Sequence, residues 1–214
     1  MATTAAIIDI LMLLGSWLVG LIVYRLFAAQ RVAKLEDIAG VVLNIILLTW
    51  VGKVVFQLPL FLQDPIAVLA YPSSANALYF GIFIAFILLT RKAYKESIDL
   101  NKQLYGFVYS LLFASFSYNT TDLIVFENTF AIYNLIILAV VVITLIIVDQ
   151  HLKPGLLSGL LISLWSAGHL IMQFWAPFTT TFSFLLAPWF VAVVLIAGIS
   201  LIIHTTRKKV SRYD

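Results

Sequence analysis

Lys53 is the residue whose position most strongly suggests chemistry. The chain has 13 Lys and Arg residues, and the other twelve lie in or beside alternate loops between long apolar runs, whereas Lys53 lies inside one of those runs. A cation in hydrocarbon costs roughly 2.5–3.5 kcal/mol on insertion scales, so it normally faces a bundle interior with a partner or ligand. Because an ammonium group is a good partner for phosphate, an anionic ligand is one interpretation. The other is a side chain that snorkels to the outer membrane surface.

Three further polar residues in apolar runs are predicted to share the level of Lys53. With a rise of about 1.5 Å per helical residue, Lys53 and His169 lie about 21 Å, and Asn119 about 22 Å, above the inner ends of their helices. Asn134 lies about 9 Å below the outer surface, the same level in a core of about 30 Å. As an alternative, such side chains only hydrogen-bond between helices, at an average of about 0.6 kcal/mol. Two neighbours are expected beside them, Tyr133 and Gln173.

The composition indicates that membrane helices position these residues. Hydrophobic residues make up 63% of the chain and charged residues only 11%, so lipid rather than water is the solvent. Unpaired backbone groups cannot face lipid, and the long apolar runs therefore predict helices. We expect an all-α integral membrane protein with seven transmembrane helices, over residues 5–29, 39–62, 76–91, 104–126, 129–149, 155–175 and 180–204.

The basic residues outside the spans predict the orientation. All twelve follow span one, lie between spans three and four or five and six, or follow span seven. Because Lys and Arg favour cytoplasmic loops, the N-terminus is expected outside and the C-terminus inside. One membrane domain is expected over residues 1–206, with a short basic cytoplasmic tail over residues 207–214. Between spans two and three, residues 65–75 are too polar and proline-rich for a span and are expected along the outer interface.

The composition also excludes several kinds of chemistry. The chain has no cysteine, which excludes thiol redox chemistry and a thiolate metal site within it. Its three histidines are scattered along the sequence, so we expect neither a metal site nor a cofactor. Topology accounts for the basic residues, and we expect no nucleic-acid partner.

Several sequence segments occur in an order that resembles that of a known family. Residues 51–66 combine Gly52 and Lys53 with an aromatic-rich helix end and an Asp-Pro turn. Residues 81–92 form a helix with a basic inner end, residues 153–155 a turn, and residues 164–175 a further polar-bearing span. In this order and spacing they resemble the bacterial prolipoprotein diacylglyceryl transferases, over most of the chain.

The resemblance implies an enzyme that moves a diacylglyceryl group from phosphatidylglycerol to the cysteine thiol of a prolipoprotein. It also implies a multi-pass protein of the bacterial cell (inner) membrane, with a polar cavity that opens to the outer leaflet. This chain departs from the family at the positions of its main motifs. It has Asn76 for the His of a His-Gly-Gly motif, only Asn119 from an Arg-Ile-Gly-Asn signature, Tyr133 but then Asn134 in place of Tyr-Glu, and His169 and Gln173 for an Arg and a Glu.

The replacements exchange charged or titratable groups for neutral amides, apolar residues or a less basic His. Thiol activation and phosphate stabilisation need a base and cations, and His169 and Lys53 are the remaining candidates. We therefore expect a catalytically degenerate relative that binds an anionic phospholipid such as phosphatidylglycerol and serves as a lipid-binding subunit or holds another membrane or exported protein. The alternatives are an active transferase with His169 as base, and a small-solute transporter. The expected ligand-binding residues are Lys53, Asn76, Asn119, Tyr133, Asn134 and Gln173.

Overall fold

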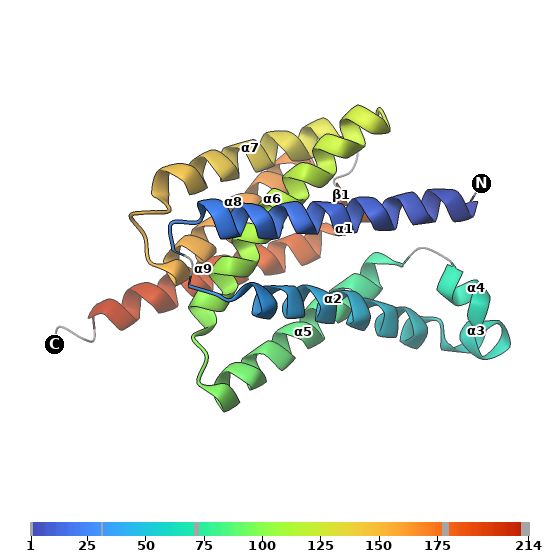
Figure 1. Ribbon diagram of the computed structural model, residues 1–214, viewed down its shortest axis with the longest axis horizontal. Coiled ribbons are helices and arrows are strands. Elements are labelled where there is room, and N and C mark those ends of the chain that lie inside the picture. Colours follow the sequence, from blue (N-terminus) through green and yellow to red (C-terminus); the bar gives the residue numbers. More distant parts are fainter. Residues whose placement is uncertain (1, 31, 71–72, 177–179, 211–214) are drawn as a thin grey trace. The chain divides into compact units, whose positions relative to one another are not determined.

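The chain folds almost entirely as helices. A computed structural model describes residues 2–30, 32–70, 73–176 and 180–210. The elements run along the chain as shown in Figure 1, in the order α1 (Ala2–Phe27), α2 (Leu35–Phe56), α3 (Leu58–Gln63), α4 (Pro65–Ala70), α5 (Ala75–Glu96), α6 (Leu100–Val125), α7 (Ala131–Val148), α8 (Pro154–Met172), β1 (Thr180–Thr181), β2 (Phe184–Leu185) and α9 (Pro188–Val210).

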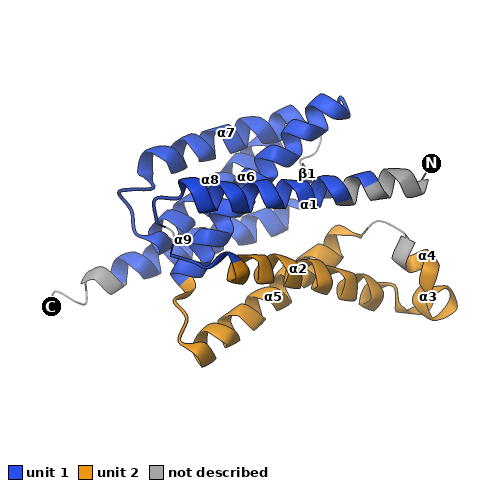
Figure 2. Ribbon diagram, in the orientation of Figure 1, with its two compact units in different colours: residues 1–35, 101–214 blue, residues 36–100 orange. Residues whose placement is uncertain are grey.

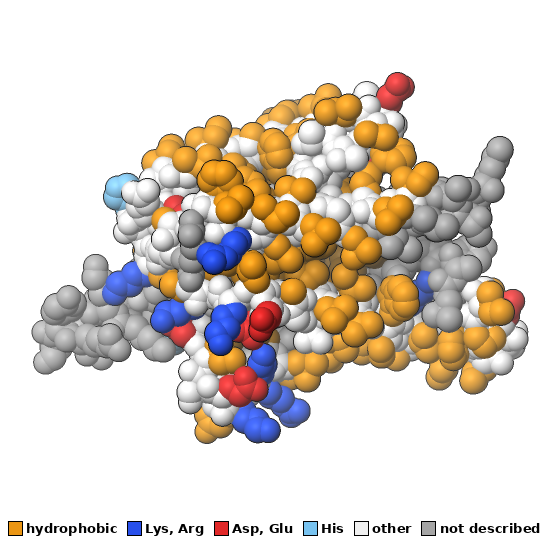
Figure 3. Space-filling model, in the orientation of Figure 1, with side chains coloured by type: hydrophobic (Ala, Val, Ile, Leu, Met, Phe, Trp, Pro, Cys, Tyr) orange, Lys and Arg blue, Asp and Glu red, His pale blue; other side chains and the backbone are white. Residues whose placement is uncertain are grey.

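Several of these helices have the length and composition of membrane spans. Among the described residues, five helices qualify on both counts, namely α2, α5, α7, α8 and α9. Helices α1 and α6 have 26 residues each, long enough to cross a core of about 30 Å. Hydrophobic side chains are spread over much of the visible face in Figure 3. The prediction of an all-α membrane protein is confirmed, whereas seven spans and their orientation stay predictions.

The second predicted span is shorter than expected. Helix α2 ends at Phe56 rather than near residue 62, and the short helices α3 and α4 follow it. Gln57 leaves the helical region with φ −119°, and Pro59 lies in the first turn of α3. Proline has no N–H and is tolerated in the first turn of a helix, so it favours a new helix at this position. Residues 65–70 of the predicted interfacial segment form α4, and residues 71–72 lie outside the described residues.

The last predicted span also begins later than expected. Residues 180–185 form a hairpin, with Thr180 paired to Leu185 and Thr181 to Phe184, and α9 begins at Pro188. Thr and Phe favour strands, and proline favours the first turn of a helix. The predicted tail starts as a continuation of α9 to Val210, and residues 211–214 lie outside the described residues.

The chain divides into two compact units, coloured separately in Figure 2. Unit 1 comprises residues 1–35 and 101–214, and unit 2 comprises residues 36–100. Unit 1 therefore contains α1, α6, α7, α8, the hairpin and α9, whereas unit 2 contains α2 to α5. The predicted functional residues are distributed between the two.

In unit 1, glycines allow α8 and α9 to pack closely. A Cβ added at Gly159 would lie 2.8 Å from Ile202 Cγ1 and 3.0 Å from the Gly198 carbonyl oxygen. A Cβ at Gly198 would lie 2.6 Å from Ser163 Oγ. Membrane helices have little hydrophobic drive to associate with one another, so small residues that allow close backbone approach stabilise such a crossing.

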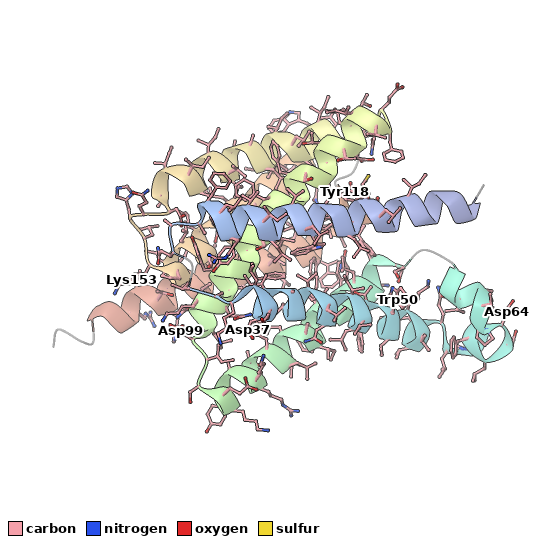
Figure 4. All side chains as sticks on the ribbon, viewed as in Figure 1. Asp37, Trp50, Asp64, Asp99, Tyr118 and Lys153 are labelled. Carbon is pink, nitrogen blue, oxygen red and sulfur yellow. The ribbon has the colours of Figure 1, made fainter. Side chains whose placement is uncertain are left out.

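In unit 2, helices α2 and α5 pack antiparallel through small residues. A Cβ at Gly52 would lie 2.8 Å from Phe80 Cδ1 and 3.1 Å from the Ala77 carbonyl oxygen. A Cβ at Gly81 would lie 2.5 Å from Thr49 Oγ1. Earlier residues of α2 contact later residues of α5, so the two helices run in opposite directions. At the far end of the pair, Lys92 forms an exposed ion pair with Asp37, labelled in Figure 4.

Candidate functional site

Two of the predicted residues form a buried amide pair in unit 1. Asn119 of α6 and Asn134 of α7 are 5% and 3% exposed. Asn134 Nδ2 donates to Asn119 Oδ1 at 3.0 Å, and Asn119 Nδ2 donates to the Ser115 carbonyl at 2.8 Å. The equal depth predicted for these two residues therefore corresponds to a direct hydrogen bond between two helices.

The amide pair has one unused acceptor. Since Asn119 Nδ2 is bound to Ser115, its Oδ1 is the atom that faces Asn134, and this fixes Nδ2 of Asn134 as the donor. Asn134 Nδ2 also lies 3.4 Å from Thr180 Oγ1, whereas Asn134 Oδ1 has no hydrogen-bond partner among the described residues. A buried acceptor without a partner costs about 1–3 kcal/mol. The pair is therefore a place where a hydrogen-bond donor from a ligand or water would be stabilised.

His169 of α8 is another predicted residue with a buried atom that lacks a hydrogen-bond partner among the described residues. It is 1% exposed, its ring centroid lies 4.4 Å from that of Trp165, and its Nδ1 has no hydrogen-bond partner within the described residues. The adjacent Gly168 contacts Ile137, where a Cβ would lie 2.8 Å from Cγ2. Ile137 is three residues from Asn134 on α7, so the rise per residue places His169 within about 3 Å of the level of Asn134 along the helices.

The remaining predicted residues of unit 1 lie at the edge of this region. Gln173 is half-buried at the end of α8, and its backbone N–H donates to the His169 carbonyl at 3.2 Å. Tyr133 is also half-buried, next to Asn134 on α7. Neither side chain forms part of the Asn119–Asn134 hydrogen bond. Both stay predicted ligand contacts.

Unit 2 contains the other two predicted residues, Lys53 and Asn76. Lys53 is 6% exposed and lies in the last turn of α2, where its carbonyl accepts from the Gln57 N–H at 3.1 Å. The C-terminal end of a helix carries partial negative charge and favours a cation, so the earlier end of α2 supplies a structural reason for Lys53. Asn76 is exposed in the first turn of α5. The predicted common level of Lys53 with the residues of unit 1 stays a prediction.

The hairpin that lies within the last predicted span contacts the amide pair through Thr180. Phe182 and Ser183 form the two-residue turn between β1 and β2, with φ of 49° and 64°. Positive φ at both central residues is typical of a type I′ turn, which favours Asn and Gly. For other residues such a backbone costs on the order of 1–3 kcal/mol each and persists only where surrounding contacts hold it. A Phe at this position is therefore held by its side-chain contacts.

Those contacts come from α1 and α6. The Phe182 ring stacks on Trp17, with centroids 6.0 Å apart, and meets Tyr118 edge to face at 5.3 Å. Tyr118 Oη and Ser183 Oγ share a hydrogen bond of 2.6 Å. Figure 4 labels Tyr118 on α6, one residue before Asn119. Thr and Phe, which favour strands, are frequent before Pro188, and this was the sequence signal for the hairpin.

Unit 1 also contains a second buried polar cluster, which the sequence analysis did not predict. Asp149, at the end of α7, is 5% exposed. Its carboxylate accepts from Tyr105 Oη at 2.6 Å and from the Ala29 N–H at 2.8 Å. Gln30 Nε2 donates to the Asp149 and Leu152 carbonyls at 3.1 and 2.7 Å. The sequence signal for this cluster was an acidic residue at the end of an apolar run. Because the Asp149 carboxylate has hydrogen-bond partners, the cluster connects α7 to α6 and to the segment after α1 and does not need a ligand.

The comparison with known proteins gives no family assignment. The chain matches no protein-family model, no curated protein and no solved structure. Fold and composition define the class as an all-α, membrane-embedded protein. Its function is therefore argued from the polar groups inside the helices.

Proposed function

We propose that this chain is a divergent relative of the prolipoprotein diacylglyceryl transferases that binds a phospholipid from the outer leaflet. In this proposal it acts as a lipid-binding or partner-holding subunit of a bacterial cell membrane and has lost efficient transfer chemistry. The observation that carries the proposal is the Oδ1 of Asn134, which lies in a buried amide pair and has no hydrogen-bond partner in the described part of the chain. A lipid head group with hydrogen-bond donors would supply a partner for this oxygen, and the glycerol hydroxyls of phosphatidylglycerol are such donors.

The polar groups favour binding over catalysis. The amides of Asn119 and Asn134 can hold a ligand through hydrogen bonds, but they neither accept a thiol proton nor carry a positive charge. His169 is the remaining candidate base near their level. Lys53, in unit 2, is the proposed phosphate contact, because an ammonium binds phosphate as a compact charge.

Native mass spectrometry of the purified protein in defined lipid mixtures tests this proposal. We expect the wild type to retain phosphatidylglycerol and Asn134→Leu to lower its occupancy by about tenfold, since one hydrogen bond of about 1.4 kcal/mol corresponds to that factor. Lys53→Met should reduce the preference for anionic over zwitterionic lipids. The matched control is Asn44→Leu, which removes an exposed amide of α2.

Retention of no lipid by the wild type, or equal occupancy in Asn134→Leu and Asn44→Leu, would overturn the proposal. Complementation separates binding from catalysis. If the wild-type chain restores lipoprotein modification in cells depleted of the normal transferase, and His169→Ala does not, the chain is an active transferase instead of a degenerate one.

A further inference from the structure

The hairpin over residues 180–185 is fixed at three places to the helices around the amide pair. Phe182 packs against Trp17 and Tyr118, Ser183 shares a hydrogen bond with Tyr118, and Thr180 Oγ1 approaches Asn134 Nδ2. All of these residues belong to unit 1. The hairpin thus combines a direct contact with the amide pair and an anchor on the helix turn that precedes Asn119.

The turn of the hairpin does not favour its own conformation. Phe182 and Ser183 both have positive φ, and neither is Gly, Asn or Asp, the residues that adopt it readily. The two strands have two residues each, so few backbone hydrogen bonds stabilise the hairpin from within. Its closed position therefore depends on the Phe182 ring and the Ser183 hydroxyl. When these contacts break, the strained turn is released as well.

Opening would change the surroundings of the amide pair in a specific way. The Thr180 hydroxyl would leave Asn134, whose Oδ1 already has no partner among the residues that the structure describes. The region would then be open to a group that replaces Thr180 as acceptor and donates to Oδ1, and a lipid hydroxyl can do both.

We propose that the 180–185 hairpin is a latch on the Asn119–Asn134 site, closed by the Phe182 ring and opened to admit a hydroxyl-bearing head group. The contacts that close the latch are observed in the structure, whereas the identity of the ligand rests on the proposed function. Access to Asn134 is governed by local opening, so the sequence of the turn sets how often the site is reachable.

Thiol labelling tests the latch, because the chain has no cysteine of its own. The variant Asn134→Cys is placed in liposomes without phosphatidylglycerol and treated with a water-soluble thiosulfonate reagent. Adding Phe182→Ala removes the ring from its contacts with Trp17 and Tyr118. Ala, like Phe, does not favour positive φ, so the strain of the turn is kept. We expect labelling to become about tenfold faster, the factor associated with losing two aromatic contacts.

Two controls separate the latch from general loosening. Phe184→Ala removes an aromatic ring from β2 without touching the turn and should leave the labelling rate unchanged. Tyr118→Phe removes only the hydroxyl that binds Ser183 and should give a smaller acceleration. Equal rates in Phe182→Ala and the unmodified hairpin, or equal acceleration by Phe184→Ala, would overturn the latch.

Hydrogen exchange of the wild-type chain gives a readout that needs no variant. The latch predicts faster exchange at the amides of residues 180–185 than in the middle of α8 and α9, and exchange as slow as in those helices would contradict it. Lipid retention by the chain that keeps Asn134 separates the two proposals. If Phe182→Ala accelerates labelling of Asn134→Cys, but the wild-type chain retains no phosphatidylglycerol in native mass spectrometry, the latch stands and the proposed lipid ligand fails.

Discussion

At the scale of single residues, the interior of unit 1 contains two kinds of polar group. Asp149 has its hydrogen-bond partners, whereas Asn134 Oδ1, His169 Nδ1 and Ser110 Oγ have none among the described residues. In hydrocarbon, a polar group with a hydrogen-bond partner stabilises the contact between helices. A buried polar group without a partner raises the free energy of the ligand-free protein, so binding of a partner is favoured. This difference supports a structural role for Asp149, and it is the basis of the binding role that we propose for the amide pair.

Replacement of Asp149 tests the structural role. Asp149→Ala would leave the Tyr105 hydroxyl and the Ala29 N–H buried without their partner, which should lower the free energy of unfolding by about 3 kcal/mol. Asp37→Ala removes an exposed ion pair with Lys92 and should cost about 0–1 kcal/mol. Unfolding in a detergent titration measures both values. Equal losses would show that the Asp149 cluster does not stabilise the fold.

The sequence predicted part of this residue-level picture. Helical rise alone placed Asn119 and Asn134 at one depth, and they are hydrogen-bonded. The Asp149 cluster was not predicted because the partners of Asp149 are Tyr105 of α6 and the backbone after α1, which are distant in sequence. Periodicity describes one helix at a time and does not identify such partners.

At the scale of elements, apolar length predicted the long helices but not the shorter elements. Residues 39–62 form one apolar run, yet Gln57 and Pro59 divide it into α2 and α3. Residues 180–187 were included in the last span because Phe and Leu are as apolar in a hairpin as in a helix. Hydropathy measures solvent preference and not backbone conformation, so it extends a span through any apolar neighbour.

The short helices α3 and α4 lead to an element-scale prediction. Leu62 and Ile66 are 76% and 79% exposed and come soon after α2, which has the length and composition of a membrane span. We expect them in the interfacial layer, because exposed apolar side chains at the end of a span enter the headgroup boundary. A nitroxide on Leu62→Cys should relax more with oxygen than with a water-soluble nickel chelate.

The reference for this measurement is Glu96→Cys, at the exposed, charged end of α5. A label there should relax mainly with the nickel chelate. If the labels at Leu62 and Glu96 respond alike to the chelate, the α3–α4 segment lies in water and the interfacial assignment is wrong.

At the scale of the whole molecule, composition determines the solvent of the protein and the structure determines how its polar groups are divided. The all-α membrane class follows from a chain that is 63% hydrophobic. The division into units of residues 36–100 and of residues 1–35 with 101–214 was not visible in hydropathy. It assigns Lys53 to one unit and the amide pair to the other. The proposed phosphate contact and the proposed hydroxyl contact are therefore separately testable.

The most direct test of the lipid-binding account is the side-chain carboxamide resonance of Asn134. In nanodiscs with increasing phosphatidylglycerol, the account predicts a shift of the Asn134 carboxamide ¹⁵N and ¹³C signals that saturates, as Oδ1 gains a donor, while those of the exposed Asn44 stay constant. An Asn134 resonance that is unchanged at every lipid composition would contradict the account.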